Sequence, residues 1–168
     1  MKAHLGFAIG AACLAAACTT GQTPVAKAAA VEQLQCEPSS ASDSVGVLQR
    51  TTVLSAGPLY SHVRTGKDDS EDRVTGAKLI VRAPEGVSAE KLTRLLQCHS
   101  AQVLLGQVDT SKFSNDPYSL PNAWVDIDVK GADGNYTIVL RADSVSEGLN
   151  VLHRATAFAD AQRNSAQP

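Results

Sequence analysis

Apolar and polar residues alternate strictly along residues 124–130, which is the clearest structural pattern in the chain. The apolar positions are Val125, Ile127 and Val129, and the polar positions between them are Asp126, Asp128 and Lys130. Alternation with a period of two predicts a strand with one buried and one solvated face. A glycine-containing turn, 131–135, then leads into a second apolar segment, 136–142. Together they predict an antiparallel hairpin whose second strand also turns Tyr136, Ile138 and Leu140 to the core.

Apolar residues recur every three or four positions in two other segments, as on one face of an α-helix. The first helix is expected to follow Ser88 as its N-cap and to end near Gln102. Its apolar face would consist of Ala89, Leu92, Leu95, Leu96 and His99. The second helix follows Ser144-Val-Ser-Glu147, a capping box, and ends near Gln162. Its buried face would consist of Val145, Leu149, Leu152, Ala155 and Ala159.

Two further strands are expected before the first helix. One covers residues 45–54 and stops at the Gly57-Pro58 break, and the other covers 77–83 and stops at Pro84. The polar stretch 67–73 between them is expected to be a solvated loop. Residues 103–108 are compatible with a short strand or with apolar backing, because six residues do not decide between the two by periodicity.

The element order is strand, strand, helix, strand, strand, helix. This order predicts an α+β fold, a two-layer sandwich in which an antiparallel sheet carries two helices on one face. With the first strand beside the second, the arrangement would be a permuted ferredoxin-like topology. The domain is expected to span residues 45–162, followed by a frayed tail at 163–168 that has nothing to bury.

Composition supports a single folded domain. The chain has 168 residues, of which 43% are hydrophobic and 19% charged, and its net charge is -2. A disordered chain would have fewer apolar residues and a larger net charge. A nucleic-acid-binding domain would need a clustered basic surface, which this near-neutral balance does not favour.

The first 17 residues have the pattern of a secretory signal peptide. Lys2 precedes an apolar run that extends from Leu5 to Ala17. That run is shorter than the roughly 20 residues of a membrane-spanning helix, and it ends in small residues that suit a signal peptidase. Residues 18–44, rich in alanine, serine, threonine, glutamine and proline, are then expected to form a flexible tether.

The sequence Leu14-Ala-Ala-Ala-Cys18 resembles the lipobox of bacterial lipoproteins, although its leucine lies one position earlier than is usual in that family. The resemblance covers only this N-terminal segment. It implies cleavage before Cys18, acylation of the Cys18 thiol and of the new amine, and anchoring in the cell envelope. Thr19, where an aspartate would imply retention at the inner membrane, implies the outer membrane. Lipidation at Cys13 and plain cleavage after Ala17 are the alternatives.

The remaining cysteines, Cys36 and Cys98, could form a disulfide in an exported protein. Alternatively, Cys98 could bind copper or zinc together with histidines, because thiolate and imidazole are ligands of both metals. The candidate ligands are His62, Cys98, His99 and His153. Adjacent side chains on a helix point about 100° apart, so Cys98 and His99 are poorly placed to share one ion. His99 also lies on the apolar face and is expected to be a buried, hydrogen-bonded residue.

A long connection, residues 109–122, together with Trp124 carries half of the aromatic residues expected in the mature chain: Phe113, Tyr118 and Trp124. Exposed aromatic residues between prolines could recognise a peptide or protein partner. The alternative is that these rings pin the connection onto the sheet.

Enzyme motifs are not evident in the sequence. It has no nucleophile elbow, zinc-protease helix or glycine-rich phosphate loop. A catalytic triad such as Ser61, His62 and Asp72 would have to be assembled by folding. The sequence therefore indicates a non-catalytic binding or assembly-support module of the cell envelope, with a periplasmic metal-handling or redox protein as the alternative.

Overall fold

A computed structural model describes residues 22–37, 46, 51–64, 70–108, 115–132 and 134–165 of the chain. The expected signal peptide, Cys13, Cys18 and Phe113 lie outside these residues. The helices and strands, in chain order, are α1 (Pro24–Gln35), β1 (Val53–Arg64), β2 (Ser70–Arg82), α3 (Ala89–Leu104), β3 (Val125–Ala132), β4 (Asn135–Ala142) and α4 (Val145–Ser165).

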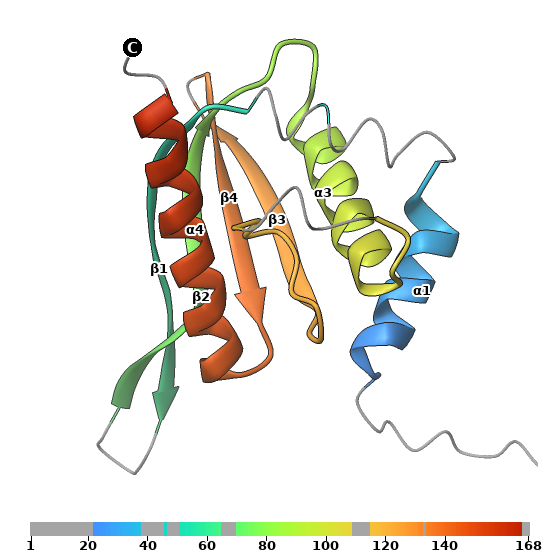
Figure 1. The fold of residues 1–168 in the computed structure, drawn as a ribbon. Helices are drawn as coiled ribbons and strands as arrows, with labels where there is room; N and C mark the ends of the chain where they lie inside the picture. Colours follow the sequence, from blue (N-terminus) through green and yellow to red (C-terminus); the bar gives the residue numbers. More distant parts are fainter. Residues whose placement is uncertain are drawn as a thin grey trace, which may run out of the picture.

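The four strands form one antiparallel sheet in the order β1-β2-β4-β3 (Figure 1). The unit β2-α3-β3 leaves room for β4 between its two strands, which is a split βαβ arrangement. β1 lies beside β2, at the edge where a ferredoxin-like fold places its last strand. The α+β sandwich with permuted ferredoxin-like topology is therefore confirmed.

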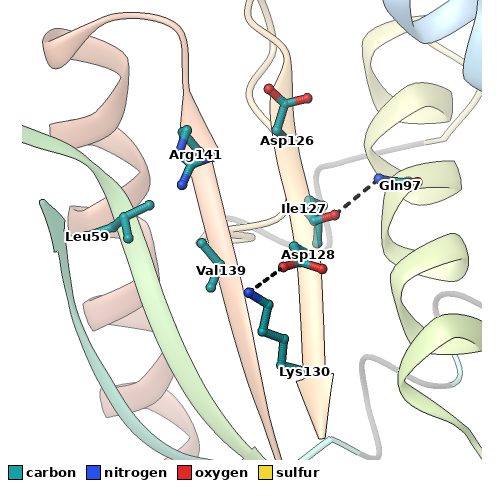
Figure 2. A pocket seen from close by; sticks show the side chains of 8 residues that line it. All are labelled: Leu59, Gln97, Asp126, Ile127, Asp128, Lys130, Val139 and Arg141. Atoms are coloured by element: carbon teal, nitrogen blue, oxygen red, sulfur yellow. Dashed lines mark hydrogen bonds and ion pairs between the residues drawn. The ribbon is translucent and has the colours of Figure 1, made fainter. Parts of the chain in front are cut away.

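Both predicted helices cover one face of this sheet, and the other face is open. α4 packs on β1, β2 and β4, while α3 packs on β3 (Figure 1). Alternation along β3 and β4 divides the side chains between the two faces: Ile127 and Leu140 are buried, whereas Asp128 and Arg141 lie on the open face (Figure 2).

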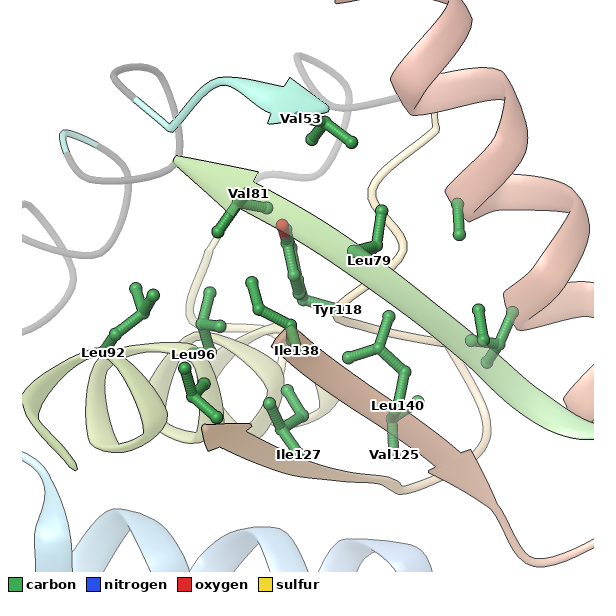
Figure 3. Packing of buried hydrophobic residues seen from close by; sticks show 14 of the residues in the cluster. Val53, Leu79, Val81, Leu92, Leu96, Tyr118, Val125, Ile127, Ile138 and Leu140 are labelled. Carbon is green, nitrogen blue, oxygen red and sulfur yellow. The ribbon is translucent and has the colours of Figure 1, made fainter. Parts of the chain in front are cut away.

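The core fills the space between the sheet and the two helices (Figure 3). Its fully buried strand residues include Leu79, Val81, Val125, Ile138 and Leu140. Leu92 and Leu96 of α3 belong to the same cluster (Figure 3). Val151 and Ala155 contribute to it from α4. Burial of this aliphatic surface supplies most of the favourable free energy of folding.

The hairpin and both helix starts are confirmed. Val125, Ile127 and Val129 are buried, and Tyr136 packs partly buried against the same core. The hydroxyl of Ser88 accepts a hydrogen bond of 3.2 Å from the backbone N–H of Lys91. The two residues of the capping box bind each other. The carboxylate of Glu147 accepts from the N–H of Ser144 at 3.1 Å, and the hydroxyl of Ser144 accepts from the N–H of Glu147 at 3.2 Å.

The two N-terminal strands differ from the prediction. β1 starts at Val53 and runs through Gly57-Pro58 without a break; of the expected strand 45–54, residues 45 and 47–50 lie outside the described part. β1 pairs only with β2, and an edge strand tolerates a proline. β2 begins at Ser70, so part of the expected loop 67–73 is strand. Residues 103–108 form the end of α3 and a turn, in which Gly106 has a positive φ of 70°.

The predicted buried face of α4 is wrong in its first two turns. Val145 is 41% exposed and Leu149 is 50% exposed, while Gly148 is buried against β2. A Cβ on Gly148 would lie 2.6 Å from the carbonyl carbon of Thr75, so the helix backbone approaches the strand backbone directly. This close approach rotates α4 so that Gly148, Val151 and Ala155 face the sheet.

The end of α4 does not fray at Gln162, because it is hydrogen-bonded to the start of β1. The side-chain amide of Gln162 accepts from the N–H of Val53 at 2.8 Å and donates to the carbonyl of Thr51 at 3.0 Å. The intervening Thr52 carbonyl points the other way and accepts from Arg82 of β2. Gln162 therefore occupies the outer edge of β1, as a short neighbouring strand would, and the helix continues to Ser165.

The expected flexible tether contains a docked helix. α1 starts with Thr23 as N-cap and Pro24 in its first turn, and it packs on the side of α3 away from the sheet (Figure 1). Ala28, Ala101 and Trp124 form a small buried cluster at this contact. Among the described residues, no helix is long and apolar enough to cross a membrane.

We predict that Gly148→Ala destabilises the domain. Helix propensity alone would favour alanine by about 1 kcal/mol. The new methyl group would instead meet the backbone of Thr75 and Gly76, which cannot rotate away, at a cost of about 1–3 kcal/mol. Gly57→Ala is the matched control, because its Cβ would have no atom within 4 Å. Urea unfolding of both variants measures the difference, and equal stabilities would contradict this account of helix docking.

Candidate functional site

The open face of the sheet carries a hollow (Figure 2). It has a volume of about 310 Å³ and is lined by Leu59, Gln97, Asp126, Ile127, Asp128, Lys130, Val139 and Arg141. Its lining residues come from all of the strands except β2, together with one residue of α3. This face is the candidate functional site.

Gly76 explains part of the hollow. It lies in β2 between Leu59 of β1 and Arg141 of β4, which pair with it on either side. Glycine has no side chain to fill the space between these two residues. A Cβ at Gly76 would come within 1.8 Å of the Leu140 carbonyl oxygen, so the local backbone requires glycine.

The charges on this face are only partly neutralised within the protein. Asp128 pairs with Lys130 at 3.4 Å, and Asp126 accepts a hydrogen bond of 2.7 Å from the indole N–H of Trp124. Arg141 forms no ion pair with any described residue. The hollow therefore combines an apolar floor, at Leu59 and Val139, with an available guanidinium.

Gln97 closes the sheet edge beside the hollow. Its side-chain amide donates a hydrogen bond of 3.1 Å from α3 to the carbonyl oxygen of Ile127 in β3 (Figure 2). The bond uses a backbone acceptor that an edge strand would otherwise expose. The rim of the candidate site is thus held in place by α3.

A second polar cluster lies inside the protein and holds the segment 115–120 between the two helices. The carboxylate of Asp116 lies 2.6 Å from Nε2 of His99 and accepts from the Ser119 hydroxyl at 2.6 Å. Its other oxygen accepts from the N–H of Tyr118 at 2.9 Å. Arg154 of α4 donates to the carbonyl oxygens of Asp116 and Ser119, at 3.2 and 3.4 Å. Because His99 and Asp116 are buried, this cluster is structural and is not accessible to a substrate.

The anchored segment places the side chain of Tyr118 in the core. Its ring is fully buried among Leu79, Val81 and Ile138 and makes an edge contact with Phe158, with ring centroids 6.0 Å apart (Figure 3). Its hydroxyl has no hydrogen-bond partner among the described residues. Burial, and then the negative charge of Asp116, raise the pKa of Tyr118 far above that of an exposed tyrosine.

The cysteines and histidines of the proposed metal set are not brought together. Cys98 is bonded to Cys36 in a disulfide with a Cα–Cα distance of 5.5 Å, so its sulfur is not a free thiolate. His99 is buried against Asp116, and His153 is exposed on α4. His62 lies on β1 beside Asp72. Among the described residues, no three histidine, cysteine, aspartate or glutamate side chains are grouped as metal ligands.

His62 and Asp72 form the exposed counterpart of the buried pair. They are register partners on β1 and β2, with 2.8 Å between Nδ1 and Oδ1. This is the histidine–carboxylate half of a triad, but Ser61 precedes His62 on the strand and points to the opposite face by alternation. Both side chains are largely exposed, at 70% and 64%, so they lack the desolvated setting in which a triad works.

Of the three aromatic residues singled out in the sequence, the structure describes Tyr118 and Trp124 and leaves Phe113 outside the described part. Tyr118 is fully buried and Trp124 is 4% exposed, so these two rings pack inside the protein and are not on an exposed surface. Sequence reasoning missed Asp116, Ser119 and Arg154, whose contacts depend on distant parts of the chain. Asn115-Asp116-Pro117 does carry a turn pattern, and that signal could have indicated the Asx turn at Asp116.

We predict that Asp116→Ala destabilises the protein strongly. Removing the carboxylate leaves the buried His99 imidazole and the Tyr118 N–H without their acceptor, at a cost of about 3–5 kcal/mol. Asp72→Ala removes the carboxylate of the exposed His62 pair, whose contribution is below about 1 kcal/mol. Chemical denaturation of both variants tests the contrast. A small loss for Asp116→Ala would show that the buried cluster does not organise the segment.

We predict that Tyr118→Phe keeps or raises stability near neutral pH. The change removes a buried hydroxyl that has no partner, a gain of about 1 kcal/mol at most. Tyr136→Phe is the control and should lose about 1 kcal/mol, because the Tyr136 hydroxyl donates to the Val87 carbonyl at 2.7 Å.

The stability of Tyr118→Phe should also depend on pH differently from that of the wild-type protein. Because the folded-state pKa of Tyr118 is raised, the unfolded chain loses this proton first, above about pH 10. Wild-type stability should therefore fall with rising pH by up to about 1.4 kcal/mol per unit more than that of Tyr118→Phe. Urea unfolding at about pH 7 and about pH 10.5 measures this, and parallel pH profiles would contradict it.

No protein-family model, no curated protein and no solved structure matches this chain.

Proposed function

We propose that this chain is a lipid-anchored protein of the cell envelope whose domain is a non-catalytic binding module. The observation that carries the proposal is the open sheet face, with its hollow and the available Arg141 guanidinium. The opposite face is covered by α3 and α4, so the open face offers the larger surface of regular structure to a partner. The occupant we propose is a segment of another envelope protein or peptide.

The disulfide supports the envelope location. Disulfides persist in oxidising compartments such as the periplasm and are rare in the reducing cytosol. Cys36 and Cys98 join α1 to α3, and they are 62 positions apart in the sequence. Together with the lipobox-like sequence that ends at Cys18, this favours an exported and anchored protein.

The use of the reactive side chains supports a binding role over a catalytic one. Cys98 is in the disulfide and His99 is sealed in the interior. The carboxylates at the hollow already contact Lys130 and Trp124. What these residues leave available is a shallow apolar floor and positive charge, from Arg141 together with the exposed Lys78 and Arg82 on the same face. This chemistry suits a partner segment that carries carboxylates.

Photo-crosslinking in the intact envelope tests the binding role. A photo-reactive residue at Thr137 or Ile80 on the open face should give a reproducible adduct with one partner, and one at Asn150 on the outer side of α4 should not. Arg141→Glu should reduce the adduct about tenfold, which corresponds to about 1.4 kcal/mol of binding free energy. Absence of a defined adduct, or equal adducts from Asn150, would overturn the binding role.

Intact mass spectrometry of the protein from bacterial membranes, without reductant, tests the anchor independently. We expect a chain that begins at an acylated Cys18, with Cys36 and Cys98 two hydrogens short of the reduced form. Reduction and thiol labelling should then add two labels. An unacylated chain would overturn the anchor but would leave the crosslinking result standing.

A further inference from the structure

One end of the domain exposes aliphatic side chains on two different helices. Val25 in the first turn of α1 is 55% exposed, and Val145 and Leu149 in the first two turns of α4 are 41% and 50% exposed. An ion pair of 3.0 Å between Lys27 and Asp143 ties these two helix starts together across 116 residues of sequence. Figure 1 shows both helix starts at the same end of the molecule.

The two described acidic side chains at these helix starts, Asp143 and Glu147, are paired within the protein. Asp143 is paired with Lys27. The carboxylate of Glu147 accepts from the N–H of Ser144 at 3.1 Å and from its hydroxyl at 2.8 Å. An anionic surface brought near these two helix starts would therefore meet aliphatic groups and internally paired charges.

The distance from Cys18 to this end is short. α1 begins at Pro24, and six residues span at most about 20 Å even when fully extended. α1 cannot swing far from the domain, because it is packed on α3 and joined to it by the Cys36–Cys98 disulfide. A lipid on Cys18 would therefore hold the start of α1, and with it the start of α4, beside the bilayer.

We infer that this end is a membrane-facing surface on which Val25, Val145 and Leu149 contact the headgroup and acyl boundary of the bilayer. The inference rests on the proposed lipid anchor. Aliphatic side chains gain free energy when they leave water for this boundary, and a second contact of this kind adds to the hold of an acyl anchor. The open sheet face then lies along the side of the anchored domain, where a partner in the envelope can reach it.

Fluorescence quenching on vesicles tests this orientation with the acylated full-length mature protein. A single environment-sensitive dye is placed on Val25→Cys or Leu149→Cys, with Leu34→Cys and Ile80→Cys as matched controls. Leu34 lies at the far end of α1 and is 80% exposed, and Ile80 is exposed on the open sheet face. The vesicles contain phosphatidylethanolamine, phosphatidylglycerol and a lipid with a nitroxide on its headgroup.

We expect quenching at Val25 and Leu149 to exceed that at the two controls about twofold or more, since interfacial side chains lie ~5–10 Å deep in the headgroup region. Equal quenching at all four positions, with Cys18 acylated by mass spectrometry, would overturn the membrane-facing surface and leave the anchor intact. An unacylated Cys18 would overturn both the anchor and the surface that depends on it.

Discussion

The buried carboxylate of Asp116 is the interaction on which the arrangement of this domain depends. One side chain links α3 through His99, the local turn through Tyr118 and Ser119, and indirectly α4, because Arg154 holds the carbonyl groups of the same turn. The two helices are separated on the sheet, and this turn inserts the Tyr118 ring into the space between them. Without the Asp116 carboxylate, the N–H of Tyr118 and the hydroxyl of Ser119 would lie in the apolar interior without this acceptor, at a large cost in folding free energy.

α3 and α4 pack on the sheet in two different ways. α3 reaches the core with leucine side chains, at Leu92 and Leu96. α4 begins with direct backbone contact at Gly148, and continues along the sheet with Val151 and Ala155. α1 lies outside both layers and buries little, so the disulfide to Cys98 supplies a connection that its short apolar contact with Ala101 would not.

Much of the fold could be predicted from the sequence because its strongest patterns are local. Alternation at 125–129 and the capping box at Ser144 specify their structures over a few residues. The rotation of α4 could not be predicted, since Leu149 and Val151 belong to two overlapping helical stripes and the choice is made by the contact of Gly148 with β2. The pairing of His99 with Asp116 joins residues 17 apart through a turn whose path is decided by the packing of Tyr118. The start of α1 had a readable signal in Thr23-Pro24, an N-cap followed by proline.

Both edges of the sheet are partly blocked to further strands, although by different means. At the start of β1, the side chain of Gln162 binds the outward N–H of Val53 and the outward carbonyl of Thr51. Pro58 has no N–H to offer in the middle of that strand. Gln97 takes an outward carbonyl of β3. Another copy of the domain would therefore meet an interrupted ladder of backbone groups at these positions, which disfavours edge-to-edge polymerisation.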